Sequence, residues 1–194
     1  MTCRRIIGLT GGIATGKSTV SRYLAERYQL PILDADLFAR EAVEPGSPIL
    51  QAIAQRYGSL ILLPGGQLNR AQLGEIIFNQ PAEKAWVEAQ IHPYVRDRFT
   101  QAMQQFPDDQ SVVQAIPLLF EADLTRQVSE IWVVTCSEAI QRQRLISRDR
   151  LSPEQAQARI ASQMPLAAKV ASADVVLHND GDRQSLYAQV DQAL

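Results

Sequence analysis

The chain has 194 residues, which suits one domain with an elaboration or a core that carries a small insert. Nineteen basic residues against twenty-one acidic ones give a formal charge of −2. This balance argues against a nucleic-acid binder that works by bulk positive charge, although it leaves room for a local arginine cluster. The cysteines, Cys3 and Cys136, form no C-x-x-C pair, so we expect neither a disulfide framework nor a zinc site, and a reducing compartment fits best.

No segment of the sequence indicates export or membrane insertion. The first residues run directly into a short apolar strand rather than into a signal-peptide core. No apolar run approaches the roughly 20 residues that span a bilayer. We therefore expect a cytoplasmic protein, a monomer or small homo-oligomer, with no membrane or nucleic-acid partner.

The chain begins with a predicted strand, a helix and a second strand. Residues 6–9 are a short apolar run that stops at a glycine cluster, which is typical of a buried strand entering a turn. From residue 17 to residue 28 the apolar positions recur at helical spacing. Residues 31–34 form a second apolar run, and the leading proline suits the first position of a strand.

The stretch from about residue 36 to residue 106 is predicted to be mostly helical and is the candidate insert. Helix starts are expected at Asp36, Pro48 and Pro81, and residues 64–66 (Pro-Gly-Gly) predict a turn. His92 precedes Pro93 within the last long helix of this stretch. Because proline removes one amide donor and crowds the preceding turn, we expect a kink or a break there.

The remainder of the chain alternates strands with helices. Residues 111–116 and 130–135 are nearly continuous apolar runs, the pattern of parallel strands covered on both faces. One helix is predicted at 137–149, a second begins at the capping box that Ser152 opens, and a third runs from 182 onward. A short strand is predicted at 174–177, between the second and third helices. This alternation predicts an α/β fold with a doubly wound parallel sheet.

Residues Gly11–Ser18 match the pattern G-x-x-x-x-G-K-[ST] of a phosphate-binding loop. We expect Gly11 and Gly16 to take positive φ, so that successive N–H groups turn inward around a phosphate. The following helix adds its unpaired N–H groups and the positive end of its dipole. Lys17 is expected to reach the β- and γ-phosphates, and the Ser18 hydroxyl to ligate Mg²⁺. A chance match is disfavoured because the motif follows a predicted strand and opens a predicted helix.

Two carboxylates, Asp34 and Asp36, follow the second predicted strand. Ligands of open α/β sheets bind at the carboxyl ends of the strands, so at least one of these groups should face the loop. A kinase needs a group there to orient the acceptor hydroxyl and accept its proton, and we assign this role to Asp36. Asp34 could support Asp36 or hold the water shell of the metal. In the alternative interpretation Asp36 only caps the next helix, and both roles are compatible.

A cluster of arginines follows the fourth predicted strand. Arg144 and Arg148 are four residues apart on one predicted helix, with Arg142 and Arg150 nearby. Arginines that converge on a transferring phosphoryl group neutralise the charge on its oxygens. The pattern fits a solvated, charged helix face equally well.

The segment Pro-Leu-Leu-Phe-Glu at residues 117–121 follows the third strand. An apolar cluster that ends in a carboxylate could line an acceptor pocket, or its leucines and phenylalanine could be core with Glu121 at the surface. His92 has no metal-ligand partner nearby in the sequence, so a structural or substrate-contacting role is favoured over metal binding.

Taken together, these motifs resemble those of the dephospho-coenzyme A kinase family, nearly from end to end. The phosphate loop is shared by many families, but the whole set in this order is far more specific. The matching motifs are Gly8–Ile13 with Gly16–Val20, Asp34–Asp36 with Ala39 and Arg40, Leu68–Arg70, Leu73, Ile77 and Phe78, His92 with Pro93, Pro117–Glu121, Gln141, Arg144 and Leu145, Arg148 and Asp149, Gln163, Ala173 and Asp174, and Asn179. One departure is that Ala14-Thr15 stands where the family usually has Gly-Ser.

The resemblance implies a three-part kinase. A nucleotide-binding core (1–35, 107–140 and 164–194) would carry a helical acceptor domain (36–106) and a lid (141–163). The catalytic residues would be Asp36, Lys17 and the lid residue Arg148. Nucleotide contacts would come from Gly11, Gly12, Ile13, Ala14, Thr15, Gly16, Lys17, Ser18, Thr19, Arg144 and Asn179. Acceptor contacts would come from Asp34, Asp36, Arg40, His92, Pro117, Leu118 and Glu121.

The reaction that the resemblance implies is transfer of the ATP γ-phosphoryl group to the ribose 3′-hydroxyl of dephospho-coenzyme A, with Mg²⁺ as cofactor. A nucleoside monophosphate kinase or a shikimate-type kinase is the alternative, since the same core would serve. A GTPase switch is disfavoured because the chain lacks an Asn-Lys-x-Asp guanine motif, the nearest candidate being Asn179-Asp180.

Overall fold

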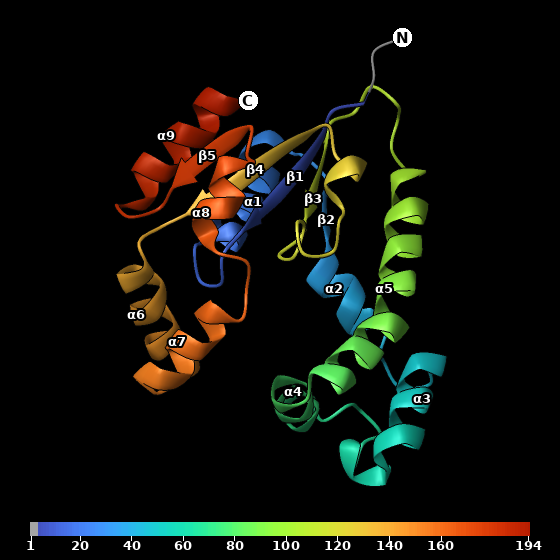
Figure 1. Ribbon diagram of the computed structural model, residues 1–194. Coiled ribbons are helices and arrows are strands. Elements are labelled where there is room, and N and C mark those ends of the chain that lie inside the picture. The colour runs from blue at the N-terminus through green and yellow to red at the C-terminus, as the bar shows by residue number, and fades with distance from the viewer. Residues whose placement is uncertain (1–3) are drawn as a thin grey trace. The chain divides into compact units, whose positions relative to one another are not determined.

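A five-stranded parallel sheet forms the centre of the larger of two compact units (Figure 1). The computed structural model describes residues 4–194, so Cys3 lies outside the described residues. The larger unit comprises the chain up to Asp34 together with residues 107–194, and the second unit is the insert, Ala35–Phe106. The strand order is β2-β3-β1-β4-β5. The strands are β1 (Ile6–Gly11), β2 (Ile32–Asp34), β3 (Val112–Ala115), β4 (Glu130–Thr135) and β5 (Val175–His178).

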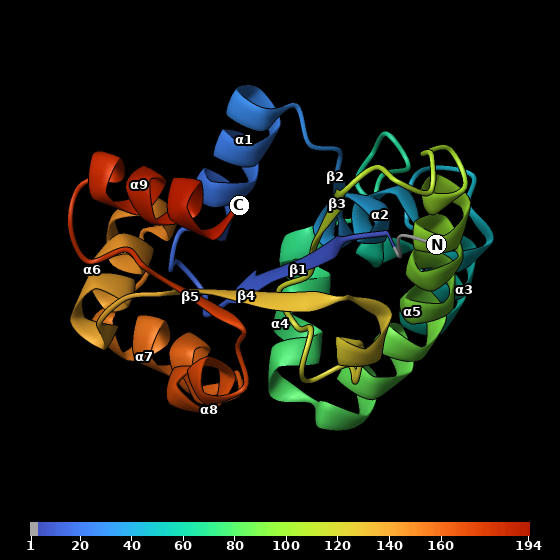
Figure 2. The ribbon, with the colours of Figure 1, turned by 90° about the horizontal axis from the view of Figure 1, so that it is seen from above.

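Helices cover both faces of this sheet, which confirms the predicted doubly wound α/β fold (Figure 2). Helices α1 (Lys17–Tyr28) and α9 (Arg183–Ala193) pack on one face, and α8 (Leu166–Ala171) packs on the other. Helices α6 (Glu138–Asp149) and α7 (Pro153–Ala161) belong to the same unit and pack against each other. The predicted capping box at Ser152 is present, but neither α8 nor the short 3₁₀ turn Thr125–Gln127 was predicted.

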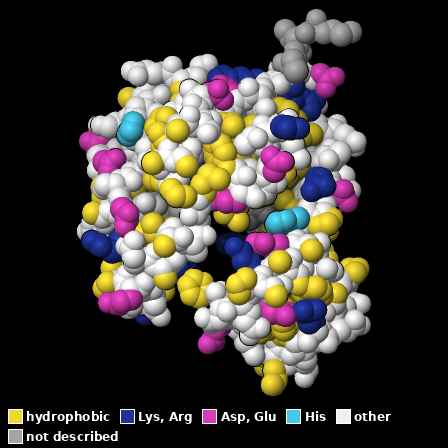
Figure 3. Space-filling view, in the orientation of Figure 1, with side chains coloured by type: hydrophobic (Ala, Val, Ile, Leu, Met, Phe, Trp, Pro, Cys, Tyr) yellow, Lys and Arg dark blue, Asp and Glu magenta, His cyan; other side chains and the backbone are white. Residues whose placement is uncertain are grey.

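Charged side chains of both signs are interspersed on the face drawn in Figure 3. This mixture agrees with the nearly balanced count of acidic and basic residues in the sequence. Across residues 4–194, no helix combines the length and the apolar character that a membrane span requires.

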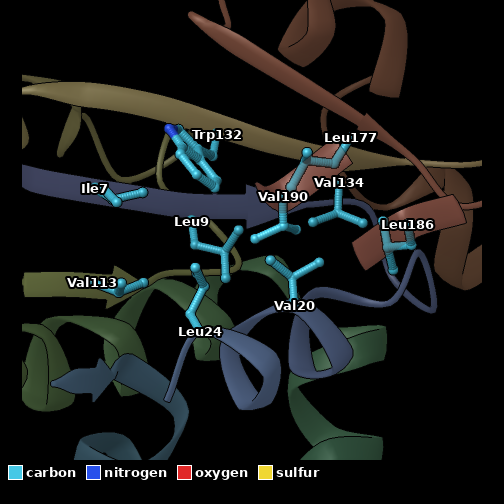
Figure 4. Close-up of a cluster of buried hydrophobic side chains, with 10 residues drawn as sticks. All are labelled: Ile7, Leu9, Val20, Leu24, Val113, Trp132, Val134, Leu177, Leu186 and Val190. Carbon is cyan, nitrogen blue, oxygen red and sulfur yellow. The ribbon is translucent and has the colours of Figure 1, made fainter. Parts of the chain in front are cut away.

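The core of the sheet unit lies between the sheet and the helices α1 and α9 (Figure 4). Successive strand residues point to opposite faces, so Ile7 and Leu9 of β1 enter this core while Gly8 and Thr10 face the other side. Both Ile7 and Leu9 are fully buried. The other members of the cluster are Val20, Leu24, Val113, Trp132, Val134, Leu177, Leu186 and Val190.

The insert is helical and has its own apolar core, which includes Ile53 and Ile61, both fully buried. Its helices are α2 (Ala35–Glu41), α3 (Pro48–Tyr57), α4 (Arg70–Asn79) and α5 (Pro81–Met103), with a 3₁₀ turn at Ser59–Ile61. The predicted starts at Pro48 and Pro81 are confirmed. Helix α2 begins at Ala35, so Asp36 is its second residue rather than its cap.

Helix α5 continues through Pro93, so of the two expected outcomes, a kink or a break, the break does not occur. A proline inside a helix removes one hydrogen bond and crowds one carbonyl, and a long helix can absorb both by bending. Figure 1 shows that α5 is bent along its length.

A partly exposed set of hydrogen bonds in the insert joins α3 to the first turn of α5 through Glu83. Arg56 donates from Nε and Nη2 to the two carboxylate oxygens at 2.6 and 2.9 Å, and the Tyr57 hydroxyl donates at 2.6 Å. Mainly Arg56, and then Tyr57, lower the pKa of Glu83 from its ordinary 4.5 to about 2. The contribution of Glu83 to folding is therefore complete above pH 4.5 and is lost as the pH falls through about 2.

We accordingly expect Glu83→Gln to reduce the rise of the free energy of unfolding with pH in the acid range. Between pH 4.5 and about 2 the unfolded wild-type chain binds more protons at Glu83 than the folded chain does, so stability rises with pH there. Urea denaturation at a series of pH values measures this slope. Glu75→Gln, at an exposed position in the same unit, should keep the wild-type slope. Equal slopes in wild type and Glu83→Gln would contradict the assignment.

Candidate active site at the phosphate-binding loop

The phosphate-binding loop connects β1 to α1, as predicted. Gly16 caps α1 with φ of 106°, a left-handed conformation that favours glycine, so its predicted positive φ is confirmed. The loop closes on itself through a hydrogen bond from the Thr15 N–H to the Gly12 carbonyl at 3.3 Å. Lys17 and Ser18 then begin α1, which directs the amino end of the helix at the loop.

Gly11 does not take the positive φ that the motif led us to expect; the left-handed residue in this part of the loop is Ala14, with φ of 60°. Gly11 is required for a different reason. A Cβ atom at this position would lie 2.5 Å from the Val134 carbonyl oxygen and 2.7 Å from Thr15 Oγ1. The glycine therefore lets β4 and the loop approach closely.

Ala14 should carry backbone strain, because a left-handed conformation costs an L-residue about 1–2 kcal/mol. Glycine would remove this cost but would add roughly 0.4–1 kcal/mol of chain entropy to the unfolded state. We expect Ala14→Gly to raise the free energy of unfolding by about 0.5–1 kcal/mol, measured by urea denaturation. As a control, Ala158→Gly in the exposed, right-handed interior of α7 should lower it by about 0.5–1 kcal/mol.

Two side chains from later in the chain donate hydrogen bonds to backbone carbonyls of the phosphate loop. Arg144 of α6 donates from Nη1 to the carbonyls of Ala14 and Thr15, both at 3.3 Å, and from Nη2 to the carbonyl of Asn179 at 2.9 Å. The buried side chain of Asn179 donates from Nδ2 to the Thr15 carbonyl at 2.6 Å. Arg144 and Asn179 are thus at the loop, as expected, and their contact with a nucleotide stays a prediction.

Two glutamines bind the backbone of Ile13 from opposite sides. Gln141 of α6 donates from Nε2 to the Ile13 carbonyl at 2.8 Å, and Gln163 accepts through Oε1 from the Ile13 N–H at 2.8 Å. The resemblance includes both residues, but we assigned no role to either from the sequence. A signal was present in Gln141, a polar residue at an apolar position of the helical period, and it is 3% exposed.

Lys17 and Asp34 form an ion pair beside the loop, with 3.8 Å between Lys17 Nζ and Asp34 Oδ2. Asp34 ends β2, in register with Ala115 of β3, which is the position at which the carboxyl edge of a parallel sheet presents its side chains. The side chains are 12% and 22% exposed. An ammonium and a carboxylate are therefore held together next to a set of backbone amides.

The Pro117–Glu121 loop lies at the same edge of the sheet; the predicted core role is confirmed for Leu119, and a role in lining an acceptor pocket stays a prediction. Leu119 is fully buried and belongs to the core, whereas Leu118 is partly exposed. The Glu121 carboxylate pairs with Lys169 of α8 at 2.8 Å. Thr10 of β1 donates its hydroxyl to the Pro117 carbonyl at 3.1 Å, which ties this loop to the strand that precedes the phosphate loop.

Arg148 binds its neighbour Asp149. Nε and Nη2 donate to the two carboxylate oxygens at 2.8 and 2.9 Å, while the Arg148 side chain stays 62% exposed. This pairing raises the pKa of Arg148 and lowers that of Asp149. The Arg148 guanidinium is thus charged and accessible, and its role at a phosphoryl group stays a prediction.

Three predicted acceptor residues, Asp36, Arg40 and His92, belong to the insert. Asp36 and Arg40 lie on α2, and the Arg40 carbonyl accepts a hydrogen bond from Arg70 Nη2 at 3.2 Å. His92 is exposed on α5. Within residues 4–194, no three His, Cys, Asp or Glu side chains are grouped closely enough to hold a metal ion by themselves.

The arrangement can bind a polyphosphate and stabilise charge on its terminal group. The amides of the loop and the start of α1 suit a phosphate, Lys17 supplies a positive charge, and Asp34 adds a carboxylate at the carboxyl edge of the sheet. A parallel sheet of this order with such a loop after its first strand defines a P-loop kinase-type phosphotransferase.

Comparison with known proteins identifies the family. The dephospho-CoA kinase family model matches residues 5–185. A dephospho-CoA kinase from Synechocystis sp. is 60% identical over 190 residues, which cover 98% of this chain and 94% of the relative. The chain belongs to the dephospho-CoA kinase family.

Solved structures agree with this membership. A crystal structure from Thermus thermophilus matches with a TM-score of 0.84 and 30% identity over 99% of this chain and 97% of that one. A dephospho-CoA kinase from Campylobacter jejuni matches with a TM-score of 0.71 and 26% identity, covering 97% and 94% of the two chains.

Proposed function

We propose that this protein transfers the γ-phosphoryl group of ATP to the ribose 3′-hydroxyl of dephospho-coenzyme A, giving coenzyme A and ADP, the last step of coenzyme A synthesis. The observation that carries the proposal is the phosphate loop with the Lys17–Asp34 pair beside it, in a chain that matches its family from residue 5 to residue 185. We further propose that the enzyme works in the cytoplasm.

The phosphate loop and its lysine provide charge stabilisation in this mechanism. Phosphoryl transfer has a loose transition state, so alignment and charge stabilisation contribute most of the acceleration. The amides from Gly11 to Thr19 would hold the β-phosphate, and the Lys17 ammonium would neutralise charge on the β- and γ-phosphates. Arg148 would exchange its contacts with Asp149 for the transferring group.

Asp36 is the proposed group that orients the acceptor hydroxyl and accepts its proton. Only one residue separates it from Asp34, so chain connectivity limits their Cα atoms to within about 7 Å of each other. Asp34 in turn ends β2 beside Lys17. Because proton transfer is late in a loose transition state, orientation of the hydroxyl would be the larger part of this role.

Magnesium fits the residues at the start of α1. The Ser18 hydroxyl follows Lys17 in the chain, and the Asp34 carboxylate pairs with that lysine. Both groups are hard oxygen donors, which Mg²⁺ prefers. Ser18 would ligate the ion, with Asp34 acting on its water shell. When bound, Mg²⁺ supplies neutralisation of the charge shared by the β- and γ-phosphates.

The two remaining regions would select and enclose the substrates. We propose the insert, 36–106, as the acceptor domain, and the segment 141–163 as a lid that excludes water and so suppresses ATP hydrolysis. The insert has its own apolar core, and this supports a separate role for it. The contacts that α6 and α7 make with each other support movement of that segment as one piece.

An acceptor panel in a coupled ADP-release assay tests this function. We expect magnesium-dependent ADP release with dephospho-coenzyme A, and none with nucleoside monophosphates or shikimate. Mass spectrometry and phosphorus NMR of the product should locate the new phosphate on the 3′ position. Phosphorylation of a nucleoside monophosphate without reaction of the coenzyme precursor would overturn the assignment.

A further inference from the structure

A fully buried lysine on α8 has no role in the phosphate-loop motif. Lysine is scarce in this chain: three of its nineteen basic residues are lysines, namely Lys17, Lys84 and Lys169. Lys17 belongs to the phosphate loop and Lys84 is on α5, with its side chain 49% exposed, but Lys169 is 0% exposed. Lysine is almost never fully buried unless its charge is paired, so this position requires an explanation.

The Lys169 ammonium joins α8 to the loop after β3. Nζ lies 2.8 Å from Glu121 Oε1 and donates to the Pro117 carbonyl at 3.3 Å. The Pro117 carbonyl also accepts from the Thr10 hydroxyl, on the strand that leads into the phosphate loop. One compact cation is therefore shared by the two ends of the Pro117–Glu121 loop.

Glu121 continues this series of contacts toward the phosphate loop. The oxygen that pairs with Lys169 also accepts a hydrogen bond from the Met164 N–H at 3.1 Å. The preceding residue, Gln163, accepts from the Ile13 N–H of the phosphate loop at 2.8 Å. Two consecutive residues thus bind to two different loops, Gln163 to the phosphate loop and Met164 to Glu121.

We propose that Lys169 is a positioning residue for phosphoryl transfer. Through Glu121 it fixes the Pro117–Glu121 loop and the Gln163–Met164 segment relative to the phosphate loop. The inference rests on the proposed kinase function. Stability alone does not account for the pair: Lys169 is fully buried while the Glu121 side chain is 23% exposed, and replacing such a pair by apolar residues of similar volume is often neutral or stabilising. Alignment does account for it, since phosphoryl transfer depends mainly on geometry.

The test uses a double variant, Lys169→Met with Glu121→Leu. Lys169→Met alone would leave the Glu121 carboxylate unpaired and is expected to destabilise the fold, whereas the double variant replaces both charges with apolar side chains. We expect it to melt at or above the wild-type temperature, with kcat lowered by about 10- to 100-fold. KM for ATP should stay close to wild type, because the interaction acts on alignment in the transition state rather than on nucleotide binding.

A second double variant, Lys169→Met with Glu121→Gln, retains an acceptor for the Met164 N–H. Its kcat is expected to lie between those of wild type and the first double variant, a partial rescue that a purely structural pair would not show. The control is Lys84→Met with Glu88→Leu, which removes the exposed pair on α5 and should leave kcat unchanged.

The outcomes separate this inference from the proposed function. Wild-type kcat in either double variant that melts like wild type would overturn the positioning role of Lys169. A wild-type enzyme that does not phosphorylate dephospho-coenzyme A would instead overturn the proposed function.

Discussion

Replacement of Lys17 by alanine is expected to lower kcat by at least about 10³-fold, the upper end of what one preorganised charge-stabilising donor contributes. The Lys17 ammonium is the positive charge beside the amides of the phosphate loop, 3.8 Å from Asp34. Because Lys17 is proposed to contact phosphate charge in the ground state as well as in the transition state, the affinity for ATP should fall with kcat. Steady-state kinetics and calorimetric titration with Mg·ATP measure the two effects separately.

The matched control is Lys84→Ala on α5, which removes the same side chain from an exposed position. It should keep wild-type kinetics and ATP affinity. Thermal melting of both variants would establish that each is folded. A folded Lys17→Ala protein with wild-type kcat would remove Lys17 from phosphoryl transfer.

Asp36→Asn is expected to lower kcat by about 10²- to 10⁴-fold, the usual contribution of a positioned general base. The asparagine side chain retains the shape of aspartate, but its neutral amide orients the acceptor hydroxyl less strongly than a carboxylate and cannot accept its proton. Binding of ATP should change little, because Asp36 is proposed to act on the acceptor. The measurements are kcat with dephospho-coenzyme A and the dissociation constant of Mg·ATP.

Asp34→Asn distinguishes the two neighbouring carboxylates. Asp34 pairs with Lys17, so its loss should disturb Mg·ATP binding as well as turnover. Asp97→Asn, at an exposed position on α5, controls for the loss of one negative charge in the insert. A near wild-type kcat in Asp36→Asn together with a large loss in Asp34→Asn would transfer the catalytic assignment to Asp34.

The parts of the molecule that depend on short-range sequence patterns were predictable. Each of the five strands lies within a residue or two of its predicted position, because buried parallel strands are short apolar runs bounded by turn residues. The phosphate loop was predictable for the same reason, since the residues that form it are consecutive. Pro48 and Pro81 mark helix starts that the structure confirms, because proline suits a position where no amide donor is needed.

The contacts that support the site could not be predicted, because they join residues far apart in the chain. Gln163 is 150 positions from Ile13, and Arg144 is 130 from Ala14. Gly11 also depends on a residue far away in the chain. Its motif suggests a positive φ, whereas packing against Val134 of β4 is what requires a glycine. Helix α8 was missed because it is only six residues long and contains a lysine that the sequence alone would place at the surface.

The pairing of the strands has a consequence for the order in which the chain acquires structure during synthesis. Within residues 4–194, β1 pairs only with β3 and β4, and β2 pairs only with β3. Neither of the first two strands therefore has a partner until Val112 has been made, by which time all of the insert has been synthesised. Because the insert is one contiguous segment with its own core, we expect it to fold first on the ribosome. The phosphate loop can form only after the second half of the chain has been synthesised.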